Sequence, residues 1–280
     1  MQHPETKEYI IVVHYANRGS LLSYLEENFS RLTWKMRLYY LKNIACYLHI
    51  MHNAEIVHCD LHGGNIGLTY WIEEDDGKVI LENTGAHICN FGHSQSVNSH
   101  GSKSTIQGVL PSIAPEVFHT CKFTKKSDIY SFGIIMYLIA TGEPPFRNRQ
   151  FDRDLVCDIM GGLRPSMPDS VPEEYKKLAE QCCDADPDKR PDILKLLTNT
   201  GKLIERARED NTWNAVYHND VKPLSRLEKE SKYSSMLLPT GDLLKPRNSP
   251  HQLLTSHQLP PLSDFSLPSS EVELEKVGKE

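Results

Sequence analysis

The sequence has no long apolar run, and this limits the classes of protein to which it can belong. The longest apolar stretch, Gly133-Ile-Ile-Met-Tyr-Leu-Ile-Ala140, is far shorter than the ~20 residues that a helix needs to cross a bilayer. The first residues also lack the charged, then apolar, then small-residue pattern of a signal peptide. We therefore expect no membrane-spanning segment and no membrane partner.

Paired cysteine motifs are missing as well. The seven cysteines are an odd number, and none has the C-x-x-C spacing of zinc and redox sites. Unpaired cysteines of this kind are typical of a reducing compartment. The pattern predicts an intracellular, cytoplasmic protein.

Basic residues are outnumbered, with 31 Lys and Arg against 37 Asp and Glu and a formal charge of −6. A protein that holds nucleic acid through its phosphates needs the opposite sign, so nucleic acid is not expected as a partner. The apolar content of 39% is on the low side for a globular chain, even with the sixteen glycines added. We therefore expect part of the 280 residues to lie outside one large or two small domains.

The first half of the chain predicts strand, helix, helix and hairpin in that order. Residues 9–13 are a short β-branched run before a turn at 17–19, and a helix opens at Ser20. From Thr33, a suitable N-cap, apolar residues recur every three or four positions for about twenty residues. Residues 56–89 suggest loop, hairpin and loop, with a turn at 75–77.

The second half predicts mostly helices. One begins with Ser127 or Asp128 as its cap and is stopped by Gly142. Others are expected at 152–161, 173–183 and 191–207, the last with proline in its first turn. The predicted fold class is therefore mainly α with a few short β-strands and hairpins.

Serine, proline and leucine dominate from about residue 210 to 280, without a helix or strand period. This composition predicts a low-complexity, mostly disordered tail. Two leucine-rich phrases within it, Ser235-Met-Leu-Leu-Pro239 and Asp242-Leu-Leu244, could instead anchor a partner.

The most informative stretch is Ile56-Val-His-Cys-Asp-Leu-His-Gly-Gly-Asn65. A carboxylate five residues before an amide suits phosphoryl transfer, because Asp60 could accept a hydroxyl proton while Asn65 binds a metal on the phosphates. The alternative is a turn that uses Asp, Gly and Asn for backbone reasons.

Four more motifs follow in order: Asn90-Phe-Gly92, Ala114-Pro-Glu116, Asp128-Ile-Tyr-Ser-Phe-Gly133 and Asp186-Pro-Asp-Lys-Arg-Pro191. Together with the first motif they resemble the large lobe of protein kinases from about residue 7 to 207. The phrase at 126–133 looks most like the tyrosine-kinase-like branch. The resemblance divides the chain into 1–25 (last small-lobe strand, hinge and first large-lobe helix), 26–209 (large lobe) and 210–280 (tail).

The resemblance implies a role for each matching residue. Asp60 corresponds to the catalytic base, Asn65 to a metal ligand, and His62 to the polar residue that approaches the transferred phosphate. The resemblance also implies three structural features: a stacked hydrophobic spine that contains His58 and Phe91, a buried ion pair between Glu116 and Arg190, and Asp128, which holds the backbone of the catalytic loop.

The resemblance also implies a nucleotide hinge near the start of the chain. His14 and Ala16 would offer backbone groups to adenine, and Ser20 would lie near the ribose. The alternative is that residues 9–20 are only an edge strand of the core.

Several positions depart from the family pattern. Asn90 replaces the aspartate that binds magnesium, so we expect weakened binding of Mg²⁺ and of ATP. Cys59 replaces the arginine that pairs with a phosphorylated activation loop. Gly67 replaces a large apolar residue under adenine, which predicts an open cleft floor. Too few residues precede Tyr9 for a small lobe, so we expect it to be truncated.

These features lead to three hypotheses. The first is a pseudokinase that acts as an interaction or signalling module, with a protein as its partner. The second is a fragment of an active ATP-dependent kinase that phosphorylates Ser, Thr or Tyr in a protein substrate. The third is a lobe that exposes hydrophobic surface around Val12, Leu25 and Phe91.

Overall fold

The computed structural model describes residues 3, 5–7, 15–75, 78–99, 105–210, 213 and 232–239. The chain divides into two units, Met1–Leu244 and Lys245–Glu280, and all described residues belong to the first. The predicted strand at 9–13, the last two residues of the predicted turn at 75–77 and most of the predicted tail lie outside the described residues.

The first two helices begin where the sequence predicts. Helix α1 (Leu21–Asn28) has Ser20 as its N-cap, whose hydroxyl accepts from the N–H of Ser23. A 3-10 turn, η1 (Phe29–Arg31), leads to α2 (Trp34–Asn53), where the hydroxyl of Thr33 accepts from the N–H of Met36 at 3.3 Å. Both predicted helix starts are confirmed.

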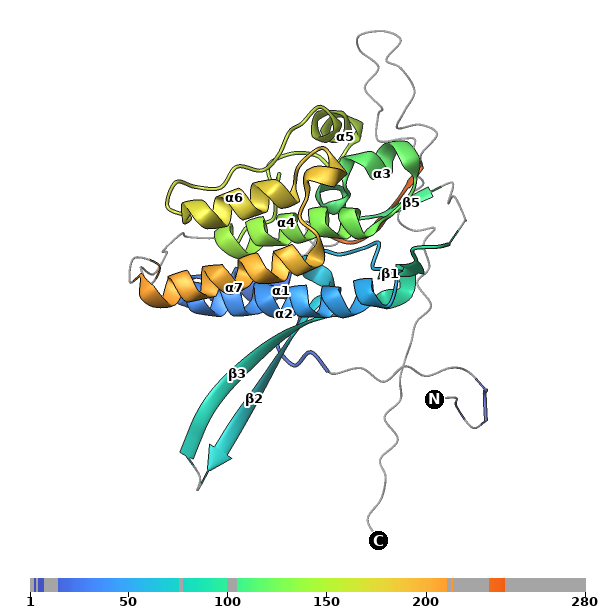
Figure 1. The fold of residues 1–280 in the computed structure, drawn as a ribbon. Helices are drawn as coiled ribbons and strands as arrows, with labels where there is room; N and C mark the ends of the chain where they lie inside the picture. The colour runs from blue at the N-terminus through green and yellow to red at the C-terminus, as the bar shows by residue number, and fades with distance from the viewer. Residues whose placement is uncertain are drawn as a thin grey trace. The chain divides into compact units, whose positions relative to one another are not determined.

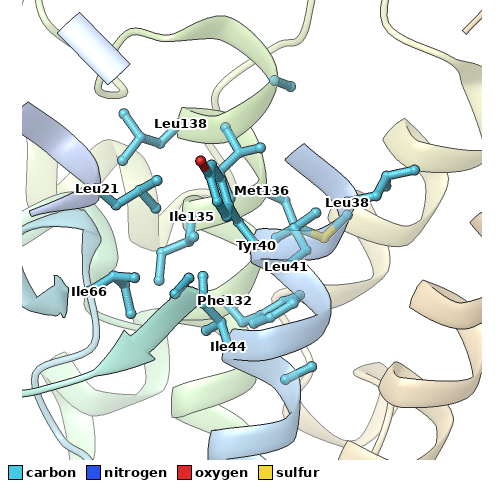
Figure 2. Packing of buried hydrophobic residues seen from close by; sticks show 14 of the residues in the cluster. Leu21, Leu38, Tyr40, Leu41, Ile44, Ile66, Phe132, Ile135, Met136 and Leu138 are labelled. Atoms are coloured by element: carbon cyan, nitrogen blue, oxygen red, sulfur yellow. The ribbon is translucent and has the colours of Figure 1, made fainter. Parts of the chain in front are cut away.

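The core forms where α1 and α2 pack against α4 (Lys125–Thr141). Figure 2 shows side chains from these helices and from strand β2 converging in one cluster, in which Leu21, Leu41, Phe132 and Ile139 are almost fully buried. Leu25 also belongs to this cluster and is 0% exposed, so the hypothesis of exposed apolar surface is wrong at Leu25. Phe91 is 43% exposed, and Val12 lies outside the described residues.

A long antiparallel hairpin follows α2 in the chain. Strands β2 (Ile66–Asp75) and β3 (Lys78–Ile88) pair from Ile66 with Ile88 to Asp75 with Lys78. The hairpin extends away from the helices in Figure 1. The hairpin predicted within residues 56–89 is confirmed.

Helix α4 follows the short α3 (Pro115–Thr120) and begins three or four residues earlier than the sequence suggests. Its cap is Thr124, and Thr124 and Ser127 form a reciprocal capping box. The prediction of Ser127 or Asp128 as the cap is therefore wrong, because Ser127 is the third helical residue and Asp128 binds another loop. Gly142 ends the helix with a positive φ of 73°, as predicted.

Three further helices complete the lobe: α5 (Arg153–Met160), α6 (Glu173–Cys182) and α7 (Ile193–Glu209). Helix α7 begins after its cap Asp192, so Pro191 precedes the helix rather than lying in its first turn. Helices α2 and α7 lie side by side in Figure 1. None of the helices in the described ranges is both long enough and apolar enough to span a membrane.

The remaining strands are short and pair across long sequence distances. Strand β1 (Ile56–Val57) pairs with β4 (Gln95–Ser96), and β5 (Thr105–Gly108) pairs with β6 (Met236–Pro239). Strand β6 was not predicted, because it lies in the predicted tail. Four more 3-10 turns connect the elements: η2 (Gly63–Asn65), η3 (Phe91–His93), η4 (Leu110–Ser112) and η5 (Pro187–Lys189).

Candidate functional site

The loop after β1 is fastened to helix α4 by one buried carboxylate. Oδ2 of Asp128 accepts the N–H of His58 at 2.9 Å, and Oδ1 accepts the N–H of Cys59 at 3.2 Å. The ring of His52 on α2 is also 3.0 Å from Oδ2. Because such charge-assisted bonds are strong in a buried setting, the position of the loop is fixed relative to α2 and α4.

His58 links this loop to the end of the hairpin. Its Nδ1 accepts the N–H of Asp60 at 3.3 Å, and its Nε2 lies 3.1 Å from the carbonyl oxygen of Cys89. Burial lowers the pKa of His58, and the nearby carboxylate of Asp128 only partly opposes this effect. The imidazole is therefore neutral, and its ring packs edge-on against Phe91 with centroids 5.8 Å apart.

Asp60 presents a buried carboxylate with several donors around it. The residue is 4% exposed, and Oδ2 accepts from the amide of Asn65 at 3.0 Å and from the hydroxyl of Ser235 at 2.5 Å. Burial by itself raises the pKa of Asp60, but His62, Ser235 and Asn65 together outweigh burial and lower it. The residue is therefore a carboxylate that accepts hydrogen bonds.

His62 supplies the second polar group of the site. Its Nδ1 accepts the N–H of Gly64 at 3.1 Å, so Nε2 is the ring nitrogen that carries a proton. Nε2 lies 3.2 Å from the hydroxyl oxygen of Ser235 and 3.6 Å from Oδ1 of Asp60. The loop passes the ring so closely that a Cβ at Gly64 would be 2.8 Å from Cε1 of His62.

Asn65 and Asn90 form an amide pair beside Asp60. The amide nitrogen of Asn65 also donates to the backbone oxygen of Asp60 at 2.8 Å, and Oδ1 of Asn65 accepts from Nδ2 of Asn90 at 3.2 Å. Asn90 has a left-handed backbone with a φ of 63°. The sequence-predicted residues Asp60, His62, Asn65 and Asn90 thus form one connected cluster.

The two amides of this cluster are poor ligands for a magnesium ion that bridges phosphates. Mg²⁺ prefers anionic oxygen ligands, whereas Asn65 and Asn90 are neutral and the oxygen of Asn65 is engaged by the other amide. Among the residues that the structure describes, no group of three His, Cys, Asp or Glu side chains is placed to hold a metal.

Of the residues predicted for the hinge, Ala16 and Ser20 lie in the described part of the chain, where Ser20 pairs with Gly67 in an isolated β-bridge. His14 is outside the described residues, the carbonyl of Ala16 accepts the N–H of Gly19 at 2.9 Å, and the hydroxyl of Ser20 caps α1. In the described part of the chain, no hydrogen bond joins Ala16 or Ser20 to Asp60.

The predicted open space at Gly67 is filled. A Cβ at this position would lie 3.0 Å from the Cβ of Ala16 and 3.1 Å from Nε2 of His87. The expected open cleft floor is therefore wrong in this structure, because neighbouring side chains occupy the place of the missing one.

Glu116 and Arg190 form a bidentate ion pair with both nitrogen–oxygen distances at 2.7 Å. The guanidinium also donates to the backbone oxygens of Lys126 and Asp184. Because the pair joins α3, the start of α4 and η5, it supports the site without taking part in its chemistry.

Ser235 is the site residue that the sequence patterns did not identify. Its hydroxyl contacts both Asp60 and His62, although 175 residues separate it from Asp60. The only sequence signal was the leucine-rich phrase that begins at Ser235, which was interpreted as a possible anchor for a partner.

Comparisons with known proteins show the family to which the chain is similar. A family model described as "Protein tyrosine and serine/threonine kinase" matches residues 2–199. A probable serine/threonine-protein kinase of Dictyostelium discoideum is 31% identical over 214 residues, which cover 74% of this chain and 11% of that protein.

Two other relatives also match most of this chain over a small part of their own length. A putative serine/threonine-protein kinase/receptor of Acanthamoeba polyphaga mimivirus is 30% identical over 196 residues, covering 69% of this chain and 11% of that protein. Cyclic GMP-binding protein C of Dictyostelium discoideum is 28% identical over 239 residues, covering 82% of this chain and 9% of that protein. The chain thus spans about a tenth of the length of these relatives.

Proposed function

Because the chain belongs to the protein kinase superfamily, we propose that it is a pseudokinase-type large lobe that binds other proteins and transfers little or no phosphate by itself. The family generally uses ATP and Mg²⁺ and acts on proteins. The tyrosine-kinase-like type is part of this proposal and rests on the motif at 126–133.

The observation that carries the proposal is the amide pair of Asn65 and Asn90. Phosphoryl transfer depends on charge stabilisation and positioning, and loss of one preorganised group of this kind costs about 10²–10³ in rate, or about 3–4 kcal/mol. Neutral Asn90 offers no anion to a bridging metal. We therefore expect binding of ATP with Mg²⁺ to be weak.

The buried charged side chains that hold the lobe together do not depend on phosphoryl transfer. Asp128, Arg190 and Glu116 fasten loops to helices, and their bonds need neither nucleotide nor metal. A folded lobe with a weakened metal site can still present a surface to a partner protein.

The test is a phosphotransfer assay with the purified 280-residue chain, ATP, Mg²⁺ and a mixture of Ser- and Thr-containing peptides. We expect transfer to be no higher than that of the Asp60→Asn variant. A parallel Asn90→Asp variant should show stronger Mg²⁺-dependent nucleotide binding in a thermal shift measurement. Transfer by the unaltered chain that Asp60→Asn abolishes would contradict the proposal.

A second candidate function is that of a fragment of an active serine/threonine kinase. The observation in its favour is the carboxylate of Asp60, which has a lowered pKa and lies 2.5 Å from a serine hydroxyl. Such a group can accept a hydroxyl proton. The discriminating experiment repeats the assay with any in-frame coding sequence upstream of Met1 included. Transfer that appears only in the longer protein would favour the fragment.

A further inference from the structure

We propose that residues 232–239 are an intramolecular ligand of the site, with Ser235 in the place of an acceptor hydroxyl and β6 as an added strand on β5. The segment must then leave before a peptide from another protein can bind there. This inference rests on the proposed function as a protein-binding lobe. It names the segment that occupies the binding site when no partner is present.

The hydroxyl of Ser235 both donates and accepts a hydrogen bond within the site. Its O–H points to Oδ2 of Asp60 at 2.5 Å, and Nε2–H of His62 donates to its oxygen at 3.2 Å. Asp60 and His62 are buried at 4% and 7% exposure. Because a bond to an ionised group in a buried site is about twice as strong as a neutral one, this contact favours one placement of the segment.

Backbone pairing aligns the segment on the lobe. Strand β6 runs antiparallel to β5, with Met236 opposite Gly108 and Leu238 opposite Ile106. A Cβ at Gly108 would be 3.5 Å from Oδ1 of Asp60, so the end of β5 lies directly beside the carboxylate. The register therefore carries the residue before Met236 to Asp60, as when an extended peptide adds a strand to a sheet edge.

Apolar contacts anchor the segment on each side of Ser235. Tyr233 is 6% exposed and packs edge-on against Phe151, with ring centroids 5.1 Å apart. Leu238 packs against the cluster that contains Ile106. Lys232 also donates to the backbone oxygen of Arg147 at 3.3 Å. The side chains of Tyr233 and Leu238 thus anchor the segment on either side of the Ser235 hydroxyl. The segment is therefore held by more than one polar contact.

Covalent attachment favours this occupant over a free peptide. The segment follows α7, which ends at Glu209, in the same chain. A tethered ligand has an effective concentration of about millimolar when its linker can span the distance. The tethered segment then outcompetes a free peptide of micromolar affinity. The peptide binds only when its own concentration is high or when the segment has left the site.

Release would follow from a negative charge at Ser235. A phosphate or a glutamate there would face the carboxylate of Asp60 across the same short contact, and like charges in a buried site repel strongly. The neighbouring Ser234 is exposed and provides a matched control position.

The experiment compares hydrogen exchange of the β5 amides in the unaltered full chain, Ser235→Glu and Ser234→Glu. We expect protection of residues 105–108 to fall about tenfold or more in Ser235→Glu and to stay within about twofold in Ser234→Glu. A Ser235→Ala variant, which only removes the hydroxyl, should show a loss in the same direction and covers the case in which the glutamate variant does not fold.

A second readout uses a fluorescent synthetic peptide of residues 231–241. It should bind Ser235→Glu at least tenfold more tightly than the unaltered chain or Ser234→Glu. Unchanged protection of β5 in both Ser235 variants would overturn the inference, whatever the peptide does. The phosphotransfer assay reports on the proposed function alone, so failure of either idea can be told from failure of the other.

Discussion

Asp128 is a buried carboxylate that stabilises the lobe through the hydrogen bonds that it accepts from backbone N–H groups. Replacing it with alanine leaves the N–H groups of His58 and Cys59 without their acceptor in a buried loop. We predict that Asp128→Ala lowers the free energy of unfolding by about 3–5 kcal/mol in urea titrations.

Asp158→Ala is the matched control for this measurement, because its ion pair with Arg149 at 2.7 Å is on the surface. Exposed pairs contribute about 0–1 kcal/mol, so the control should differ little from the unaltered chain. Equal losses in the two variants would show that Asp128 does not hold the loop.

His58 makes the stability of the lobe depend on pH. Its pKa is lowered by burial, so between that folded value and about 6.5 the unfolded chain binds more protons. Stability should therefore fall as the pH drops through this interval, by at most about 1.4 kcal/mol per pH unit for one histidine. Titration of the His58 ring followed by NMR measures the folded pKa directly.

A His58→Phe variant should have a smaller pH dependence of melting temperature below pH 6.5 than the unaltered chain. The same change at the exposed His119 should leave that dependence as it was. A ring signal of His58 that titrates at or above its ordinary value would contradict this prediction.

At the residue scale, Asp60 and Asn65 were placed on one loop because their spacing is local information, and the resemblance to protein kinases added Asn90 to the site. Ser235 could not be found in this way. Its contact with Asp60 spans 175 residues of sequence, and a single serine carries no period. The filled space at Gly67 was missed for the same reason, since Ala16 and His87 come from distant segments.

At the scale of elements, helices and the long hairpin were predictable because their apolar periods and turn residues are local. Helix α4 shows where prediction from local sequence fails. Asp128 is a good capping residue by type, but its carboxylate is engaged by the loop after β1, and Thr124 takes the cap instead. Strand β6 was missed because a run of four residues, Met236–Pro239, is too short to show a strand period.

The capping box of α4 leads to a prediction about Thr124. Thr124→Ala removes the acceptor for the N–H of Ser127, and we expect a loss of about 1 kcal/mol in the free energy of unfolding. Thr198→Ala is the control, because Thr198 is exposed within α7 and alanine favours a helix interior. The control should be neutral or slightly stabilising in urea titrations, and a loss as large as that of Thr124→Ala would argue against the cap.

At the scale of the whole molecule, the packed lobe extends beyond the region that the family model matches. The match ends at residue 199, yet Trp213 is 3% exposed and packs edge-on against Trp34, with ring centroids 5.6 Å apart. Trp34 in turn contacts Tyr175 at 5.0 Å. The residues after α7 therefore contribute to the core.

Two shortened chains test this boundary. A chain that ends at residue 244 retains the whole first unit, so its melting temperature should equal that of the full chain. A chain that ends at 210 loses Trp213 and β6, and loss of a buried tryptophan alone costs about 3–5 kcal/mol. For a domain of this size each kcal/mol lowers the melting temperature by about 2–4 °C.

Trp213→Ala in the full chain separates the contribution of the aromatic cluster from that of β6. We expect it to account for most of the loss in the chain that ends at 210, because Trp213 lies in the core beside Trp34, whereas Leu238 of β6 is only partly buried. Calorimetry of the three chains measures this division. If the chain ending at 210 melts at the temperature of the full chain, the lobe ends with α7 and Trp213 contributes nothing to its stability.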